Sequence, residues 1–291
     1  MCGIYGAVVS QGEATADMAV LARMADALVH RGPDQDGRVV RGRAGLGCRR
    51  LAIIDVEGGT QPMSNERGDV VAVCNGEIYN HVALRAELAA RGHQLRTRSD
   101  AEVIPHLYEE RGLGFVDALD GMFAIALWDA AAGRLVLVRD RLGEKPLFYT
   151  TGPRGLLFAS EATALLATGA VDRIADGAAL GAYLRVGYVP APASAFAAIT
   201  KLPPGARLVL TPEVLEVERY WEVAPLLAGP VEPLDLSTAA VQLRTHLRRA
   251  VEAAMVSDVP LGVFLSGGLD STAVAALARR AFGPGLATFA L

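Results

Sequence analysis

Short apolar runs bounded by turn residues dominate the first three quarters of the chain. They predict strands at 3–9, 36–41, 44–54 and 69–75, followed by four more in succession between 122 and 160. Many strands with only a few helices between them are typical of stacked sheets covered by helices. The pattern therefore predicts an α+β layered domain.

Three stretches among these strands have helical spacing instead. Apolar residues recur along one side of 16–29. Asn80 is placed to cap a second helix that ends near Gly92. Ser99 and Glu102 have the spacing of a capping box, which predicts the start of a third helix. We expect these helices to cover the sheets.

Prolines interrupt the pattern after the last of these strands. The segment 187–205 is rich in proline and is predicted to be extended and irregular. Beyond it, RLVL and RYWEV are candidates for two final strands of the same domain.

A second proline-rich stretch divides the chain. Residues 223–236 include three prolines and a glycine, and a long helical pattern at 237–255 follows them. We therefore predict a first domain at 2–222, a linker at 223–236 and a second domain at 237–291.

The second domain has a different order of elements. An apolar run GVFL is followed by the loop SGGLDS, an alanine-rich helix and the apolar run LATFAL. Strand, loop, helix and strand in this order predict the beginning of an α/β domain with a parallel sheet. Because one such unit does not complete a parallel sheet, we expect the chain to be part of a longer protein.

Composition narrows the classes of function. The 291 residues suggest about two domains, and 52% hydrophobic residues can form a large core. The net charge of −4 and the lack of a basic run argue against a nucleic-acid partner. No apolar stretch approaches the roughly 20 residues of a membrane span, and no signal peptide is recognisable. We expect a cytoplasmic protein without membrane contact.

The three cysteines show no CxxC spacing and no neighbouring pair of histidines, which disfavours metal or disulfide frameworks. Cys48 and Cys74 lie in apolar runs and are predicted to be core residues. Cys2 stays open at this point, as a core residue, a metal or disulfide partner, or a nucleophile at the chain terminus.

The loop SGGLDS is a candidate anion site. It lies between a strand and a helix, so backbone N–H groups and the hydroxyls of Ser266 and Ser271 can surround a phosphate. It lacks the GK[ST] of the Walker form. The alternative is a flexible Ser-Gly linker, but core-forming elements flank it on both sides.

Asn75-Gly76 has two interpretations. Between apolar runs the pair is typical of a tight hairpin turn. It can also present an amide side chain and a free N–H to a developing oxyanion.

Two charged residues are equally open. Arg50 can bind a carboxylate through two hydrogen bonds or lie at the surface. Asp100 can hold an ammonium group or support the start of a helix.

The order of these motifs resembles a known family. Cys-Gly-Ile at the start, HRGPD, RRLAIID, QPMSN, NGEIYN, DGMFAIALWD and RDRLGEKPLFY resemble the class II glutamine amidotransferases. These have an N-terminal-nucleophile fold of four αββα layers. GYVPAP, KLPPG and SDVPLGVFLSGGLDS extend the resemblance to the glutamine-hydrolysing asparagine synthetases, and SGGLDS resembles the PP-loop of ATP pyrophosphatases.

The resemblance implies roles for residues of the first domain. It makes Cys2 the nucleophile and places the oxyanion hole at Asn75 and Gly76. The implied glutamine-binding residues are Arg50, Leu51, Ala52, Ile53, Ile54, Asn75, Gly76, Glu77 and Asp100.

For the second domain the resemblance implies ATP and Mg²⁺ as cofactors, with Asp270 as the metal ligand. The implied ATP-binding residues are Leu265, Ser266, Gly267, Gly268, Asp270, Ser271 and Leu291. Glutamine, aspartate and ATP are the implied substrates, and a homodimer is the implied assembly.

A terminal cysteine has a chemical advantage in such an enzyme. If Met1 is removed, Cys2 gains a free α-amine, whose pKa of about 7.7–8.0 lets it accept the thiol proton near neutral pH. No histidine is then needed as a base. Ammonia released from glutamine is expected to attack β-aspartyl-AMP in the second domain.

Three alternatives compete with this reading. A related amidotransferase can deliver nitrogen to another carboxylate, for example in secondary metabolism. A β-lactam synthetase-like ligase no longer cleaves glutamine, and the presence of Cys2 argues against it. A non-catalytic module does not explain why Cys2, Arg50, Asn75 and Asp100 occur together.

Overall fold

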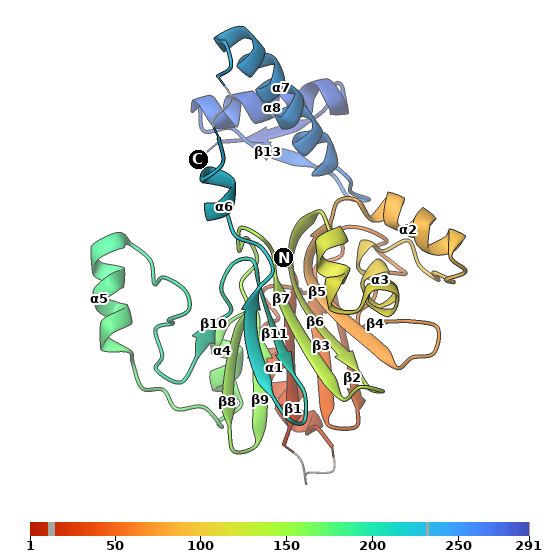
Figure 1. Cartoon of the computed structure of the whole chain (residues 1–291), viewed down its shortest axis with the longest axis vertical. Coiled ribbons are helices and arrows are strands. Elements are labelled where there is room, and N and C mark those ends of the chain that lie inside the picture. Colours follow the sequence, from red (N-terminus) through yellow and green to blue (C-terminus); the bar gives the residue numbers. More distant parts are fainter. Residues whose placement is uncertain (11–14, 231–232, 291) are drawn as a thin grey trace. The chain divides into compact units, whose positions relative to one another are not determined.

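The structure is a computed structural model that describes residues 1–10, 15–230 and 233–290. The chain forms two compact units, Met1–Glu222 and Val223–Leu291. Figure 1 shows the elements of each unit, coloured along the sequence.

The first unit contains two six-stranded sheets whose paired strands are all antiparallel. In one sheet the order is β10-β8-β9-β1-β3-β2, with β1 Gly3–Val9, β2 Gln35–Arg41, β3 Ala44–Arg50, β8 Phe148–Gly152, β9 Gly155–Ala159 and β10 Thr200–Lys201. In the other the order is β12-β11-β7-β6-β5-β4, with β4 Met63–Ser64, β5 Val70–Ile78, β6 Gly121–Asp129, β7 Arg134–Arg139, β11 Ala206–Leu210 and β12 Leu215–Arg219.

Alternating side chains place the two sheets face to face. Val73 of β5 packs in one buried cluster with Ile4 of β1 and Phe158 of β9, which belong to the other sheet. Its neighbour Cys74 points the opposite way, into a cluster with Ile104 of the helix α3 Val103–Arg111. Successive side chains of a strand point to opposite faces, so β5 is buried between the other sheet on one face and helices on the other.

Helices cover both outer faces, as Figure 1 shows. The helices α1 Met18–Asp26 and α4 Ala162–Ala167 pack on the sheet of β1. The helices α2 His81–Ala90 and α3 Val103–Arg111, with the 3₁₀ segments Asp100–Glu102 and Gly112–Ala118, pack on the sheet of β5. The predicted αββα order of four layers is therefore confirmed.

Several local predictions were wrong. The predicted strand 44–54 ends at Arg50, and RYWEV contributes only Arg219 to β12. Ser99 and Glu102 form no capping box, because Glu102 accepts hydrogen bonds from Arg96 N and both the N–H and the hydroxyl of Thr97. The helices α4 and α5 Gly177–Val186 were not predicted.

The second unit contains the helices α6 Ala224–Leu227, α7 Leu236–Ala253 and α8 Leu269–Phe282 and the strands β13 Gly262–Phe264 and β14 Ala287–Phe289. β13 precedes α8 in the chain and β14 follows it, and the two strands pair in parallel. This confirms the predicted strand-helix-strand unit. The helix α6 lies within the predicted linker, of which 231–232 are outside the described residues. Among the described helices, none is long and apolar enough to cross a bilayer.

Candidate active site

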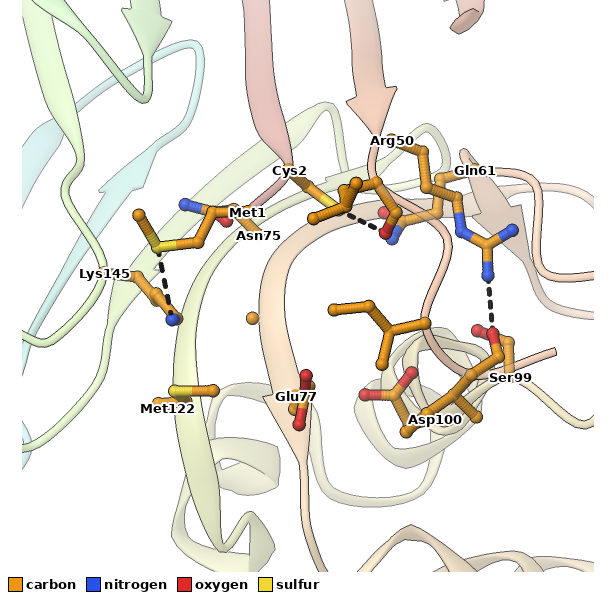
Figure 2. A pocket seen from close by; sticks show the side chains of 14 residues that line it. Met1, Cys2, Arg50, Gln61, Asn75, Glu77, Ser99, Asp100, Met122 and Lys145 are labelled. Atoms are coloured by element: carbon orange, nitrogen blue, oxygen red, sulfur yellow. Dashed lines mark hydrogen bonds between the residues drawn. The ribbon is translucent and has the colours of Figure 1, made fainter. Parts of the chain in front are cut away.

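A pocket of about 280 Å³ lies in the first unit at the start of β1 (Figure 2). It brings together eight of the nine predicted glutamine-binding residues with Cys2. The lining residues are Met1, Cys2, Arg50, Leu51, Ile53, Ile54, Gln61, Asn75, Gly76, Glu77, Ser99, Asp100, Met122 and Lys145.

Ala52 is the predicted residue that does not line the pocket. Its backbone N–H donates to the carboxylate of Asp34 at 2.9 Å, and Asp34 N donates to the carbonyl of Arg50 at 3.1 Å. The HRGPD motif therefore holds the segment after β3 in place.

Cys2 precedes β1 and is held from both sides. Its thiol lies 3.7 Å from the carbonyl of Leu51, and its own carbonyl accepts from Arg31 Nε at 2.9 Å. A hydrogen bond from the thiol of Cys48 and the positive charges of the terminal ammonium and Arg50 lower the pKa of Cys2 to about 7, although burial opposes this. The same contact and burial raise the pKa of Cys48 well above its usual range. The thiol of Cys2 is therefore the one prepared to ionise.

Cys48 and Cys74 are both buried to 1% exposure, as predicted for core cysteines. Burial also raises the pKa of Cys74 well above its usual range. Neither competes with Cys2 as a nucleophile, because the thiolate is the reactive form.

The amino terminus lies in the same pocket. Lys145 Nζ is 3.6 Å from the sulfur of Met1 (Figure 2). Burial, together with the charges of Arg31 and Lys145, lowers the pKa of the Met1 ammonium, against the attraction of Cys2. An amine at this position therefore loses its proton more readily than one in water.

Asn75 and Gly76 do not form a hairpin turn, so that interpretation is wrong. Both lie inside β5, opposite Ala124 and Phe123 of β6. The Asn75 side chain is fully buried, and among the described residues neither its amide nitrogen nor its amide oxygen has a hydrogen-bond partner. Because an unpaired buried amide costs free energy, a polar ligand in this pocket is its natural partner.

Gly76 is fixed by the approach of β6. Its φ of +151° is rarely adopted by other residues, and a Cβ there would lie 1.9 Å from the carbonyl oxygen of Met122. A side chain at position 76 would therefore displace the strand beside Asn75.

Arg50 is buried, with 4% exposure, so the surface interpretation is wrong. Its Nη2 donates to the carbonyls of Ile54 at 2.6 Å and Asp55 at 3.0 Å. Its Nη1 donates to Gln35 Oε1 and to the carbonyl of Val56. The guanidinium thus shapes the loop after β3 and also brings a positive charge to the pocket.

Two carboxylates lie on the other side of the pocket. Asp100 is 7% exposed and accepts from Ile78 N at 2.8 Å. Burial raises the pKa of Asp100, and burial together with the charge of Asp100 raises the pKa of Glu77. Two neighbouring anions of this kind gain from a cation placed between them.

Sequence reasoning missed five residues of the pocket: Met1, Gln61, Ser99, Met122 and Lys145. Gln61 belongs to the QPMSN motif, and its amide pairs with both backbone groups of Cys74, at 3.0 and 2.6 Å. It therefore aligns the strand that carries Asn75.

Lys145 is placed by the turn of the RDRLGEKP motif. The Asp140 carboxylate accepts from the backbone N–H groups of Phe123, Leu142, Glu144 and Lys145, at 2.9 to 3.3 Å. The Asp140 side chain, 1% exposed, therefore organises the turn around itself. The RDRLGEKP motif is visible in the sequence. Its role depends on backbone hydrogen bonds to Asp140, which the pattern of apolar residues does not reveal.

The SGGLDS loop of the second unit joins β13 to α8. Gly267 has a φ of +79°, and Gly268 begins α8 with no side chain capping it among the described residues. The hydroxyls of Ser266 and Ser271 are 3.0 Å apart, and Asp270 lies exposed in the first helical turn. Leu265 N donates to the carbonyl of Phe289, whereas the predicted contact at Leu291 lies outside the described residues.

Comparison with known families agrees with this geometry. Residues 1–221 match the family model of the glutamine amidotransferase domain. The chain belongs to this family. Residues 242–291 of this amidotransferase chain match the asparagine synthase family model.

Curated relatives extend the resemblance over both units. The chain is 39% identical over 285 residues to asparagine synthetase [glutamine-hydrolyzing] 3 of Bacillus subtilis, covering 97% of this chain and 46% of the relative. It is 35% identical to asparagine synthetase B [glutamine-hydrolyzing] of Escherichia coli, covering 96% and 45%. The predicted resemblance is confirmed, and the chain spans less than half the length of these relatives.

Solved structures show the same fold at low identity. The structure of the allosteric regulatory enzyme of purine biosynthesis superposes with a TM-score of 0.56 at 17% identity, covering 99% of this chain and 65% of that one. The glutamine phosphoribosylpyrophosphate amidotransferase of B. subtilis, complexed with ADP and GMP, gives 0.54 at 19% with the same coverage.

Proposed function

We propose that the amidotransferase unit releases ammonia from glutamine with Cys2 as its nucleophile. The observation that carries this proposal is the joint position of Cys2 and Asn75. A thiol with a pKa of about 7 and a buried amide without a partner among the described residues line one pocket. A nucleophile next to an unpaired donor is the arrangement that acyl transfer needs.

The base in this proposal is the α-amine of Cys2, which becomes free when Met1 is removed. The amine takes the thiol proton, and the thiolate sulfur attacks the side-chain amide carbon of glutamine. The C–N bond breaks, ammonia leaves with the proton from the amine, and a glutamyl thioester remains on Cys2. Water then attacks the thioester, which releases glutamate and restores the thiol.

Asn75 and Gly76 are proposed to stabilise the oxyanion of both steps. Each such donor is worth about 2.7–4 kcal/mol in the transition state. The strand that carries Asn75 is held in register by the amide of Gln61, which binds both backbone groups of Cys74.

The ends of glutamine are proposed to bind on opposite sides of the pocket. Asp100 and Glu77 attract the α-ammonium group, while Arg50 attracts the α-carboxylate by its charge. Because the Arg50 donors already bind the carbonyls of the 51–58 loop, we propose that loop residues 51–54 complete the carboxylate site.

The SGGLDS loop is proposed to bind ATP, with its phosphates at the start of α8. Free N–H groups at the helix start and the two serine hydroxyls suit phosphate oxygens. Mg²⁺ is held through one or two carboxylates together with substrate phosphates, so the single carboxylate of Asp270 fits it. The bound ion would neutralise phosphate charge there. Leu265 and Leu291 are proposed to contact the nucleotide.

The overall reaction that we propose is asparagine synthesis from aspartate, glutamine and ATP. The names of the curated relatives support aspartate as the acceptor over another carboxylate, and support asparagine synthesis over the reaction of a β-lactam synthetase-like ligase. A cytoplasmic location, assembly into a homodimer and the domain limits 2–222, 223–236 and 237–291 stay predictions.

Glutamine hydrolysis by purified variants tests the proposal. Cys2→Ala is expected to abolish glutamate release, and Asn75→Ala to lower kcat by about 10²–10³. Cys74→Ala, which removes another buried thiol, is the matched control and should retain activity. Hydrolysis that persists in Cys2→Ala would refute the assignment of the nucleophile.

A further inference from the structure

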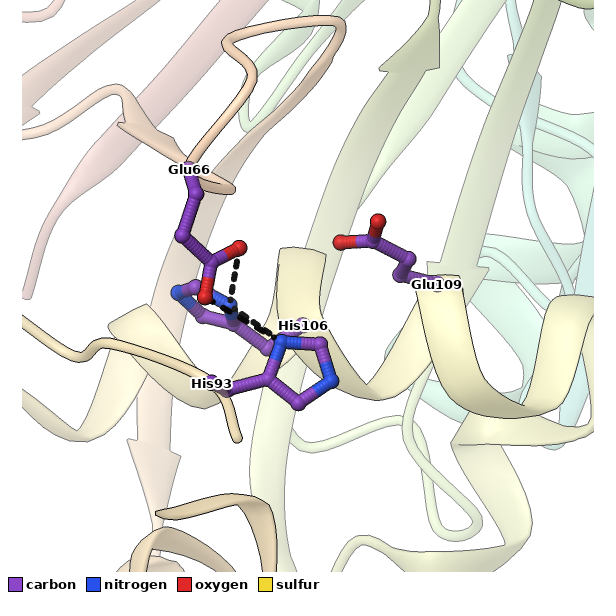
Figure 3. A group of neighbouring side chains, drawn as sticks. All are labelled: Glu66, His93, His106 and Glu109. Atoms are coloured by element: carbon purple, nitrogen blue, oxygen red, sulfur yellow. Dashed lines mark hydrogen bonds and ion pairs between the residues drawn. The ribbon is translucent and has the colours of Figure 1, made fainter. Parts of the chain in front are cut away.

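Four side chains of the first unit converge outside the glutamine pocket (Figure 3). Glu66 follows β4, His93 follows α2, and His106 and Glu109 belong to α3. One possible ligand atom from each lies within 4.8 Å of all the others. None of the four lines the pocket around Cys2.

The distances among three of these groups match a coordination shell. His93 Nδ1 is 3.2 Å from His106 Nδ1 and 3.3 Å from Glu66 Oε1, and His106 Nδ1 is 3.3 Å from Glu66 Oε2. A tetrahedral zinc ion with bonds of about 2.0–2.1 Å holds its ligand atoms about 3.3–3.4 Å apart. The two histidine nitrogens therefore have the separation of two corners of such a shell, and the Glu66 carboxylate presents one oxygen to each of them.

Hydrogen bonds around the group orient these ligand atoms. His93 Nε2 lies 3.2 Å from Glu110 Oε1, so a proton on Nε2 leaves the lone pair of Nδ1 facing Glu66. The N–H of Gln94 donates to Glu66 Oε1 at 2.7 Å. A carboxylate behind a histidine is the usual second partner of a metal-bound imidazole.

The group is poorly matched by protons alone. If both Nδ1 atoms carry protons, two N–H groups face each other across 3.2 Å. If only one carries a proton, that N–H can donate to the other Nδ1 or to Glu66, but the unprotonated nitrogen still lies 3.3 Å from a carboxylate oxygen. His106 is 1% exposed, so water does not reach its ring freely, and the polar partners of its Nδ1 come from within the group.

We propose that Glu66, His93 and His106 bind one divalent transition-metal ion of the zinc class. Imidazole nitrogens and carboxylate oxygens are common ligands of zinc, and this group supplies two imidazoles and a carboxylate. A carboxylate oxygen of Glu109 lies within 4.8 Å of the other ligand atoms. Asn65 Nδ2 and Arg67 Nη2 hold its two oxygens at 3.1 and 2.6 Å. Glu110, which orients His93, forms an ion pair with Arg91 Nη1 at 2.9 Å.

The ion would join three segments that are separated in the sequence. It ties the turn after β4 to α3 and to the end of α2. The chain between His93 and His106 carries Ser99 and Asp100 into the glutamine pocket. The site is therefore structural, and it fixes both ends of a segment that the pocket uses.

Metal titration of the full chain tests this proposal. The protein is first freed of metal with a chelator. Zinc binding is then followed by calorimetry, and Co²⁺ binding is followed by the visible absorption of the bound ion. Because thiols also bind zinc, the titration is repeated in Cys2→Ala. We expect one ion per chain in both proteins, a tetrahedral Co²⁺ spectrum without thiolate bands, and a higher Tm with zinc.

Three variants assign the ligands. His93→Gln should lose stoichiometric binding, and Glu110→Gln should weaken it about 10–100-fold. His30→Gln is the matched control, because His30 also pairs with a glutamate, Glu161, at 3.0 Å, and it should bind zinc as the original chain does. If His93→Gln fails to fold, Glu66→Gln takes its place. The absence of one-to-one binding, or equal affinity in His93→Gln, would overturn the proposal.

Discussion

At the scale of single residues, the pocket depends on a difference between two thiols. Cys2 and Cys48 are in contact, but the Cys48 thiol donates to Cys2 and lowers the pKa of the latter to about 7. The same hydrogen bond, together with burial, raises the pKa of Cys48 well above its usual range and keeps it neutral. The sequence distinguished Cys2 only by its position, whereas the structure adds the donor that stabilises its thiolate.

Alkylation by iodoacetamide should report this difference. The thiolate is the reactive form, so the rate at Cys2 should rise with pH and level off above a midpoint near 7, since the lowered pKa makes the thiolate available earlier. Peptide mapping of the native chain against pH measures it, with Cys48 and Cys74 staying unmodified. A midpoint near the unperturbed value of about 8.5 would contradict the assignment.

At the scale of elements, the sequence predicted the layers well, because strands buried on both faces, such as β5 and β6, are short continuous apolar runs bounded by turn residues. It failed at Asn75-Gly76, where a local turn motif lies inside a continuing strand. It placed a turn between β7 and β8 but did not reveal how the turn is held, since four backbone N–H groups converge on Asp140 only after β6 and β7 have paired. The histidine cluster shares this property, because its ligands come from three separate segments.

Asp140→Ala should destabilise the first unit strongly. The change leaves four backbone N–H groups without their acceptor. Those of Phe123 and Lys145 make buried hydrogen bonds, and each buried unpaired donor costs about 1–3 kcal/mol. We expect a loss of at least about 2 kcal/mol in the free energy of unfolding by urea. Asp172→Ala, at an exposed position, should change it by no more than about 0.5 kcal/mol. Equal stability of the two variants would show that Asp140 does not organise the turn.

At the scale of the whole molecule, two units with different sheets divide the proposed chemistry. The antiparallel unit carries the thiol, and the parallel unit carries the phosphate loop. The proline-rich stretch, and the change from successive strands to a strand-helix-strand unit, made this division predictable from the sequence. The acceptor site was not predictable, because the chain spans less than half the length of its curated relatives.

A longer protein that contains both units should separate the two half-reactions. In such a protein, Cys2→Ala should lose glutamine-dependent asparagine formation and retain the ammonia-dependent reaction, since the change removes only the source of ammonia. Product formation with each nitrogen donor measures this. Loss of both reactions would mean that Cys2 supports the structure instead.

The central claim is that Cys2 carries the glutamyl group during hydrolysis. The most direct measurement is an acid quench of the chain during turnover with glutamine, followed by intact mass and peptide mapping. We predict a mature N-terminus at Cys2 and an added glutamyl group on the first peptide, which is absent from Cys2→Ala. Hydrolysis that proceeds with no adduct at Cys2, or with an adduct on another residue, would contradict the account.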